Sequence, residues 1–213
     1  MDGVRGLDLP TGEYTFRVAD TLSNAQPVSA LIGGGEVRLY DVVGPAGRKA
    51  LEVTAVPGAT PLADDMVGTV VRAADGESIL TLEDRGWTRS YALYDAAEGD
   101  TVATMRKSWY AVGPVEVRDS TEAHRATVSR AGRLPALGAQ PKPRHLTTPN
   151  NEPIAQLEHA KVADAPTSKP RLKWKPTVTI QSAGLPSVVV LAVCLAVSED
   201  IRSEKEDSTG PTQ

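Results

Sequence analysis

The chain has 213 residues, of which 40% are hydrophobic, so it can bury one sizeable core and is most simply a single domain. Its net charge of -4 argues against a general nucleic-acid-binding protein, which would normally be basic overall. Its single cysteine, Cys194, cannot form an internal disulfide, and the N-terminal segment lacks the pattern of a signal peptide. These features predict a soluble cytoplasmic protein, and the richness in alanine and arginine indicates a bacterial source.

Short strands separated by turns are predicted over residues 14–128. Residues 14–18 alternate between apolar and polar side chains, as a half-buried strand does. The segment 36–55 reads as strand, turn and strand, and we expect Val37 and Leu39 to share one face of the first strand.

Turn residues punctuate this region. The pair Asp75-Gly76 is a strong hairpin signal, because both positions tolerate a positive φ. A weak internal repeat places an aspartate at the end of a strand, before a polar turn, at Asp41, Asp95 and Asp119. A short carboxylate there can accept hydrogen bonds from turn N–H groups, which favours a structural role over a metal site. Repeated hairpins at this interval predict an all-β sandwich or barrel.

The second half of the chain is more varied. Residues 131–153 are rich in proline, glycine and polar side chains and predict a long surface loop inserted between strands. Two further strands are expected at 154–162 and 172–180. The segment 206–213 is polar and is expected to be a disordered tail.

The apolar run Leu185–Val197 could form a helix, a strand or a membrane anchor. A helix over 185–202 fits best, because Pro186 suits a first helical turn and the run is too long for an ordinary strand. At about 1.5 Å per residue the run spans roughly 20 Å, short of the roughly 30 Å hydrocarbon core of a bilayer. A helix that is apolar on all sides and then becomes amphipathic enters a core and leaves it, so we expect the strands to enclose it.

The strung hairpins and the terminal helix resemble the tubby C-terminal-like group, and within it the LURP-one-related proteins. The specific part of the resemblance covers residues 91–119, with a strand ending in Tyr94-Asp95, a glycine-containing turn and a strand at 102–107 similar to VATIRRK. The resemblance implies one domain over 1–205, a closed barrel of about twelve antiparallel strands threaded by the hydrophobic helix. Closure would remove exposed sheet edges, and the helix would fill a lumen too wide for side chains.

The same resemblance implies a role at membranes. Tubby proteins bind phosphoinositides and phospholipid scramblases act at membranes, although the cysteine-rich stretch of scramblases is absent here. Cationic side chains that could hold an anionic headgroup occur at three places, and an ordinary solvated surface is the alternative reading of each. These candidates are Arg171, Lys173 and Lys175, which share one face if 168–176 is a strand, Lys142 and Arg144 in the long loop, and Arg106 and Lys107 beside Trp109 and Tyr110.

No motif for a specific reaction is present. The chain lacks a nucleophile elbow, a phosphate-binding Gly-Lys-Ser/Thr loop and a His-Glu-x-x-His helix. Because His124, His145 and His159 do not have the spacing of metal ligands, we expect no catalytic residue, metal or cofactor. The sequence therefore predicts a non-enzymatic protein that binds anionic phospholipid at a membrane surface. The alternatives are an adaptor for a protein partner and, less favoured, an enzyme whose site is assembled only by the fold.

Overall fold

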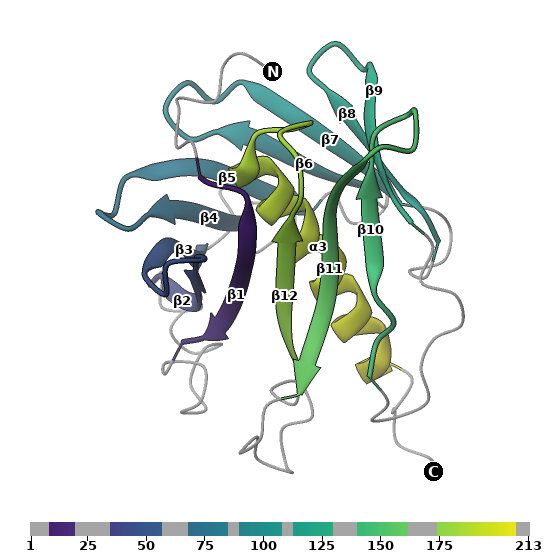
Figure 1. Cartoon of the computed structure of the whole chain (residues 1–213). Coiled ribbons are helices and arrows are strands. Elements are labelled where there is room, and N and C mark those ends of the chain that lie inside the picture. Colours follow the sequence, from purple (N-terminus) through teal and green to yellow (C-terminus); the bar gives the residue numbers. More distant parts are fainter. Residues whose placement is uncertain are drawn as a thin grey trace, which may run out of the picture.

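In the computed structural model of the protein, twelve antiparallel strands close into a barrel around one long helix (Figure 1). The structure describes residues 9–19, 35–56, 68–84, 90–107, 113–129, 140–161 and 174–207. The strands are β1 (Gly12–Val18), β2 (Val37–Val43), β3 (Lys49–Val56), β4 (Gly68–Ala73), β5 (Ser78–Asp84), β6 (Ser90–Asp95), β7 (Thr101–Lys107), β8 (Val115–Asp119), β9 (His124–Val128), β10 (Arg144–Thr147), β11 (Pro153–Lys161) and β12 (Trp174–Ile180), and the helix is α3 (Ser187–Asp207).

Each strand pairs with the strand before it and the strand after it in the chain. The first strand closes the barrel by pairing with the last, in a register that runs from Gly12 opposite Ile180 to Thr15 opposite Thr177. A closed sheet leaves no row of unpaired backbone groups along an edge. The predicted barrel of about twelve strands around a C-terminal helix is confirmed.

The helix fills the barrel. Every side chain of α3 from Val188 to Ser198 is buried, on all sides of the helix. The barrel wall contributes to this core the side chains on the inner face of each strand, such as Tyr14 and Phe16 of β1. Burying one Val or Leu side chain contributes about 1.5–3 kcal/mol, so this segment is a large part of the core. Within the described residues, no helix combines the length and apolar character that a membrane crossing requires.

Both ends of α3 differ from the sequence prediction. The helix begins at Ser187, whose hydroxyl donates a hydrogen bond to the Leu9 carbonyl at 2.8 Å and so fixes the entry to the barrel. It continues to Asp207 instead of stopping near 202, because its charged last turns are rich in good helix formers. Two residues of the predicted tail therefore belong to the helix, and 208–213 lie outside the described residues.

Strand β2 contains an irregularity that alternation did not predict. Its register against β3 shifts between Arg38 and Tyr40. The prediction that Val37 and Leu39 share a face is therefore wrong. The extra residue of the bulge leaves Leu39 half-buried and turns Tyr40 and Val42 into the core.

The predicted loop at 131–153 contains strand β10. This strand has only four residues, and Pro143 directly precedes it. Pairing with β11 decides which side chains of β10 face the core, and Arg144 and Leu146 are the buried ones. The prediction of an uninterrupted loop is wrong for this part, and residues 130–139 lie outside the described part of the chain.

The predicted hairpin at Asp75-Gly76 is confirmed. Gly76 has a φ of 95° and its N–H donates to the Ala73 carbonyl at 3.0 Å. The Ala73 N–H donates in turn to the carbonyl of Glu77 at 2.8 Å, so the turn is one residue longer than the two-residue form. The Asp75 carboxylate accepts the Glu77 N–H at 3.1 Å and stabilises the turn.

We expect Leu191→Ala to lower the free energy of unfolding by about 2–5 kcal/mol, because Leu191 is almost fully buried and its loss leaves a cavity in the lumen. Urea denaturation followed by circular dichroism measures this change. Glu13→Ala, at an exposed position of β1, is the control and should change stability by about 0.5 kcal/mol or less. Equal effects of the two substitutions would contradict the packing of α3 inside the barrel.

Candidate functional site

The two ends of the barrel are built differently (Figure 1). At one end, here called the hairpin end, short turns join β2 to β3, β4 to β5, β6 to β7, β8 to β9 and β10 to β11, at 44–48, 74–77, 96–100, 120–123 and 148–152. At the other, here called the loop end, lie the last residues of β1, β3, β5, β7, β9 and β11 and the end of α3. Binding residues concentrate on longer connections held by a rigid scaffold, so the loop end is the better place to look for function.

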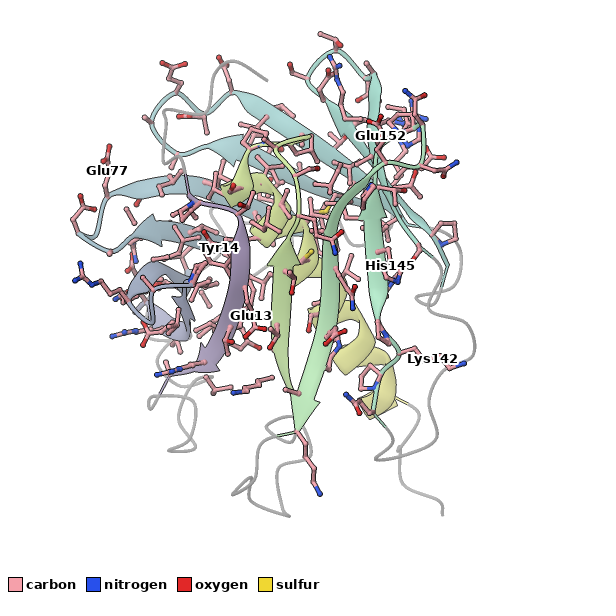
Figure 2. All side chains as sticks on the ribbon, in the orientation of Figure 1. Glu13, Tyr14, Glu77, Lys142, His145 and Glu152 are labelled. Atoms are coloured by element: carbon pink, nitrogen blue, oxygen red, sulfur yellow. The ribbon has the colours of Figure 1, made fainter. Side chains whose placement is uncertain are left out.

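The hairpin end is acidic. Most charged side chains of its turns are carboxylates, and Figure 2 shows Glu77 and Glu152 at the tips of two hairpins. The exposed charged residues of the turns are Arg48, Asp75, Glu77, Glu98, Asp100, Glu122 and Glu152. An anionic ligand or surface would be repelled from this end.

Three lysines lie toward the loop end, on or next to the consecutive strands β10, β11 and β12. Lys142 is exposed just before β10 and extends away from the barrel (Figure 2). Lys175 lies near the start of β12 on its outward face, which agrees with the predicted alternation, whereas Arg171 and Lys173 lie outside the described residues. Lys161 is exposed at the end of β11 and was missed. Its register opposite Trp174 places its backbone beside that of Lys175.

The predicted headgroup ligand Arg144 lies inside the barrel. Its side chain is 1% exposed, so the prediction of an exposed cation is wrong at this position. Its Nε donates to the Ser129 carbonyl at 2.8 Å and its Nη2 to the Gly113 carbonyl at 2.6 Å. A buried guanidinium requires such acceptors, so Arg144 has a structural role in the barrel wall.

The second predicted basic pair lies on β7. Arg106 is exposed and its Nη2 lies 3.3 Å from Oε2 of Glu122. An exposed ion pair of this kind contributes at most about 1 kcal/mol, but it balances part of the arginine charge. Lys107 is the last residue of β7, and its side chain, like Trp109 and Tyr110, lies outside the described residues.

Asp119 stabilises the turn between β8 and β9, as predicted. Its Oδ1 accepts hydrogen bonds from the Thr121 hydroxyl at 2.6 Å, the Thr121 N–H at 2.8 Å and the Ala123 N–H at 3.1 Å. Its Oδ2 accepts from Nε of Arg125 at 2.5 Å. These bonds hold the pKa of the Asp119 carboxyl far below its usual value, and the bond from the Thr121 hydroxyl has the largest effect.

The other two aspartates of the predicted repeat differ from each other. Asp95 Oδ1 accepts the N–H groups of Ala97 at 2.8 Å and Glu98 at 2.9 Å, so its predicted turn role is confirmed. Asp41 lies inside β2 and is 3.5 Å from Nζ of Lys49, so it takes part in an ion pair on the barrel surface. The prediction that Asp41 ends its strand is wrong, because β2 continues to Val43.

A buried polar pair joins α3 to the wall near the loop end. Nε2 of His159 lies 2.9 Å from Oγ of Ser198, a separation typical of a base and its nucleophile. The two residues are only 3% and 0% exposed, so a substrate from solvent does not reach them in this conformation. Gln140 donates to the His159 carbonyl at 2.7 Å, which supports a structural role. Within the described residues, no group of three His, Cys, Asp or Glu side chains is placed to hold a metal ion.

Comparisons with known proteins bear on the fold. No family model and no curated protein sequence matches the chain. An X-ray structure of a protein from Arabidopsis thaliana is similar over 90% of this chain and 92% of that one, with a TM-score of 0.51 and 10% sequence identity. A likeness at this identity shows the shared fold only, because one fold supports many functions. The protein thus belongs to the class of closed antiparallel barrels built around a helix.

We expect Asp119→Asn to flatten the dependence of stability on acid pH. Because the pKa of Asp119 is lowered in the fold, its ionised form stabilises the protein above the ordinary aspartate pKa of about 4, and this stabilisation is lost as the pH falls below it. The variant should be less stable than wild type at pH 7, and the difference should shrink toward pH 2.

Urea midpoints at pH 7, 4, 3 and 2 measure this effect. The matched control is Asp100→Asn, the same change at an exposed residue of the neighbouring turn. A difference between Asp119→Asn and wild type that stays constant over the whole pH range would contradict the assignment.

Proposed function

We propose that the protein is a non-enzymatic barrel of the tubby-like, LURP-one-related type, and that its loop end binds anionic phospholipid headgroups. The observation that carries the proposal is the charge difference between the two ends of the barrel. Exposed carboxylates dominate the turns of the hairpin end, whereas Lys142, Lys161 and Lys175 lie toward the loop end. An anionic membrane would repel the carboxylates of the hairpin end and attract these lysines, which favours an orientation with the loop end toward its surface.

The positions of the tryptophans support the proposal. Trp174 is the first residue of β12 and so belongs to the loop end. In the sequence, Trp87 lies between β5 and β6 and Trp109 lies between β7 and β8, the same kind of connection. The side chains of all three lie outside the described residues. Tryptophan is favoured at the boundary between membrane and water, where cations also meet lipid headgroups.

The charge of the loop end is not uniform. The last turns of α3, residues 199–207, carry five carboxylates and two cations in the sequence. These carboxylates oppose an anionic surface, whereas each lysine near that surface contributes about 1 kcal/mol. The proposal therefore requires modest binding that weakens as salt rises, and it fits a cytoplasmic protein held peripherally at a membrane.

We expect the full chain to sediment with vesicles that contain a phosphoinositide or phosphatidylserine, and to remain in solution with pure phosphatidylcholine. Lys142→Ala/Lys175→Ala should weaken binding roughly tenfold or more, because two surface cations are lost. Co-sedimentation at two salt concentrations measures this change. The charge-matched control is Arg48→Ala/Lys49→Ala at the hairpin end, which should bind like wild type.

A further variant, Arg171→Ala/Lys173→Ala, tests the rest of the basic row predicted from the sequence. If both loop-end variants bind as tightly as wild type, the headgroup site lies elsewhere. If the wild-type chain stays in solution with every vesicle, the lipid proposal is wrong, and the adaptor alternative is pursued by a search for a protein partner.

A further inference from the structure

The ladder that pairs β9 with β10 is the shortest in the described barrel wall. In the described structure, two residue pairs join these strands, Leu146 with Val128 and Thr147 with Thr127, whereas every other neighbouring pair of strands is joined by four to seven. Both strands are also short, with five and four residues. A short ladder provides few hydrogen bonds to resist local opening.

The backbone compensates for this on the loop-end side of the two pairs. The Ser129 N–H donates to the His145 carbonyl at 2.7 Å. The His145 N–H donates back to the hydroxyl of Ser129 at 2.9 Å. A side-chain oxygen therefore occupies the position that a backbone carbonyl has in a regular ladder. The carbonyl of Ser129 accepts its hydrogen bond from inside the barrel instead.

That inner donor is Arg144. From the first position of β10 its guanidinium reaches the Ser129 carbonyl, just past β9, and the Gly113 carbonyl, just before β8. One buried side chain thus connects β10 to β9 across the short ladder and reaches the neighbouring strand as well. Hydrogen bonds from a charged donor are about twice as strong as neutral ones, so this residue is a large part of what joins the two strands.

We propose that the β9–β10 seam, residues 127–129 against 144–147, is the line along which the barrel wall opens, and that Arg144 is the latch that holds it closed. Opening there would give solvent, a bilayer or a partner access to the helix without unfolding the rest of the barrel. The inference does not depend on lipid binding at the loop end.

Cys194 of α3 is a natural reporter for this opening. It is 2% exposed, and burial raises the pKa of its thiol to about 12, so it reacts only when the barrel opens. The positive charge of Arg144 opposes part of this rise in the thiol pKa. The chain has no other cysteine.

The test is the rate at which a thiol reagent modifies Cys194 in the folded, full-length protein. We expect Arg144→Met to raise this rate roughly tenfold or more above Leu80→Ala, after the rates are corrected for global stability. Leu80 is fully buried on β5, away from the seam, and serves as the control. Arg144→Lys, which keeps the charge but not the forked geometry, should lie between wild type and Arg144→Met.

A change in the pKa of the Cys194 thiol cannot explain a faster reaction of Arg144→Met. Removing the cation raises the pKa of the Cys194 thiol further, which by itself would slow its modification. A faster reaction in Arg144→Met therefore reports opening of the wall. Equal rates in Arg144→Met and Leu80→Ala at matched stability would overturn the proposal.

Amide hydrogen exchange of the wild-type chain provides a second readout, and it decides the question if Arg144→Met fails to fold. The amides of β10 should exchange faster than those of β3 and β4, with a weaker dependence on denaturant, because a local opening exposes little surface. If all these amides exchange with the same protection and the same denaturant dependence, the barrel opens only by global unfolding and the seam proposal is wrong.

Discussion

The constraint on which the structure depends is the volume of its lumen. Twelve strands enclose more space than their inward side chains fill, and a protein interior does not tolerate such a void. Helix α3 supplies the missing apolar volume, and because its segment 188–198 is buried on every side, this segment has no face that suits water. The barrel wall and the helix are therefore stable only together. The packed core that they form fixes the positions of the hairpin end and the loop end.

Chain connectivity explains why the two ends differ. In an up-and-down barrel, successive connections alternate between the ends, so the tight hairpin turns gather at one end and the longest connections at the other. Aspartates such as Asp95 and Asp119 stabilise the tight turns with hydrogen bonds to turn N–H groups. Residues of longer surface connections generally tolerate change better than the residues of turns that set the strand register.

Local chemistry made part of this structure predictable. The run Leu185–Val197 is apolar on all sides, and a core is the natural place for such a helix. Asp75-Gly76 and Asp119 act through neighbours within a few residues, so the sequence contains their whole context. The bulge at Leu39 and the short strand β10 depend on partners that pair from other strands. The burial of the Arg144 side chain also depends on acceptors next to other strands. The sequence around each of these residues does not show which distant residues they pair with.

Closure of the barrel through β1 and β12 affects the way the chain is made. Gly12 is among the first described residues, yet its partner Ile180 lies near the end of the described chain. During synthesis the early strands must therefore wait, with their inner faces uncovered, until β12 and α3 emerge from the ribosome. Contacts between such distant segments slow folding and leave apolar strands open to aggregation. The nascent chain is consequently a strong candidate for protection by a chaperone until its last helix arrives.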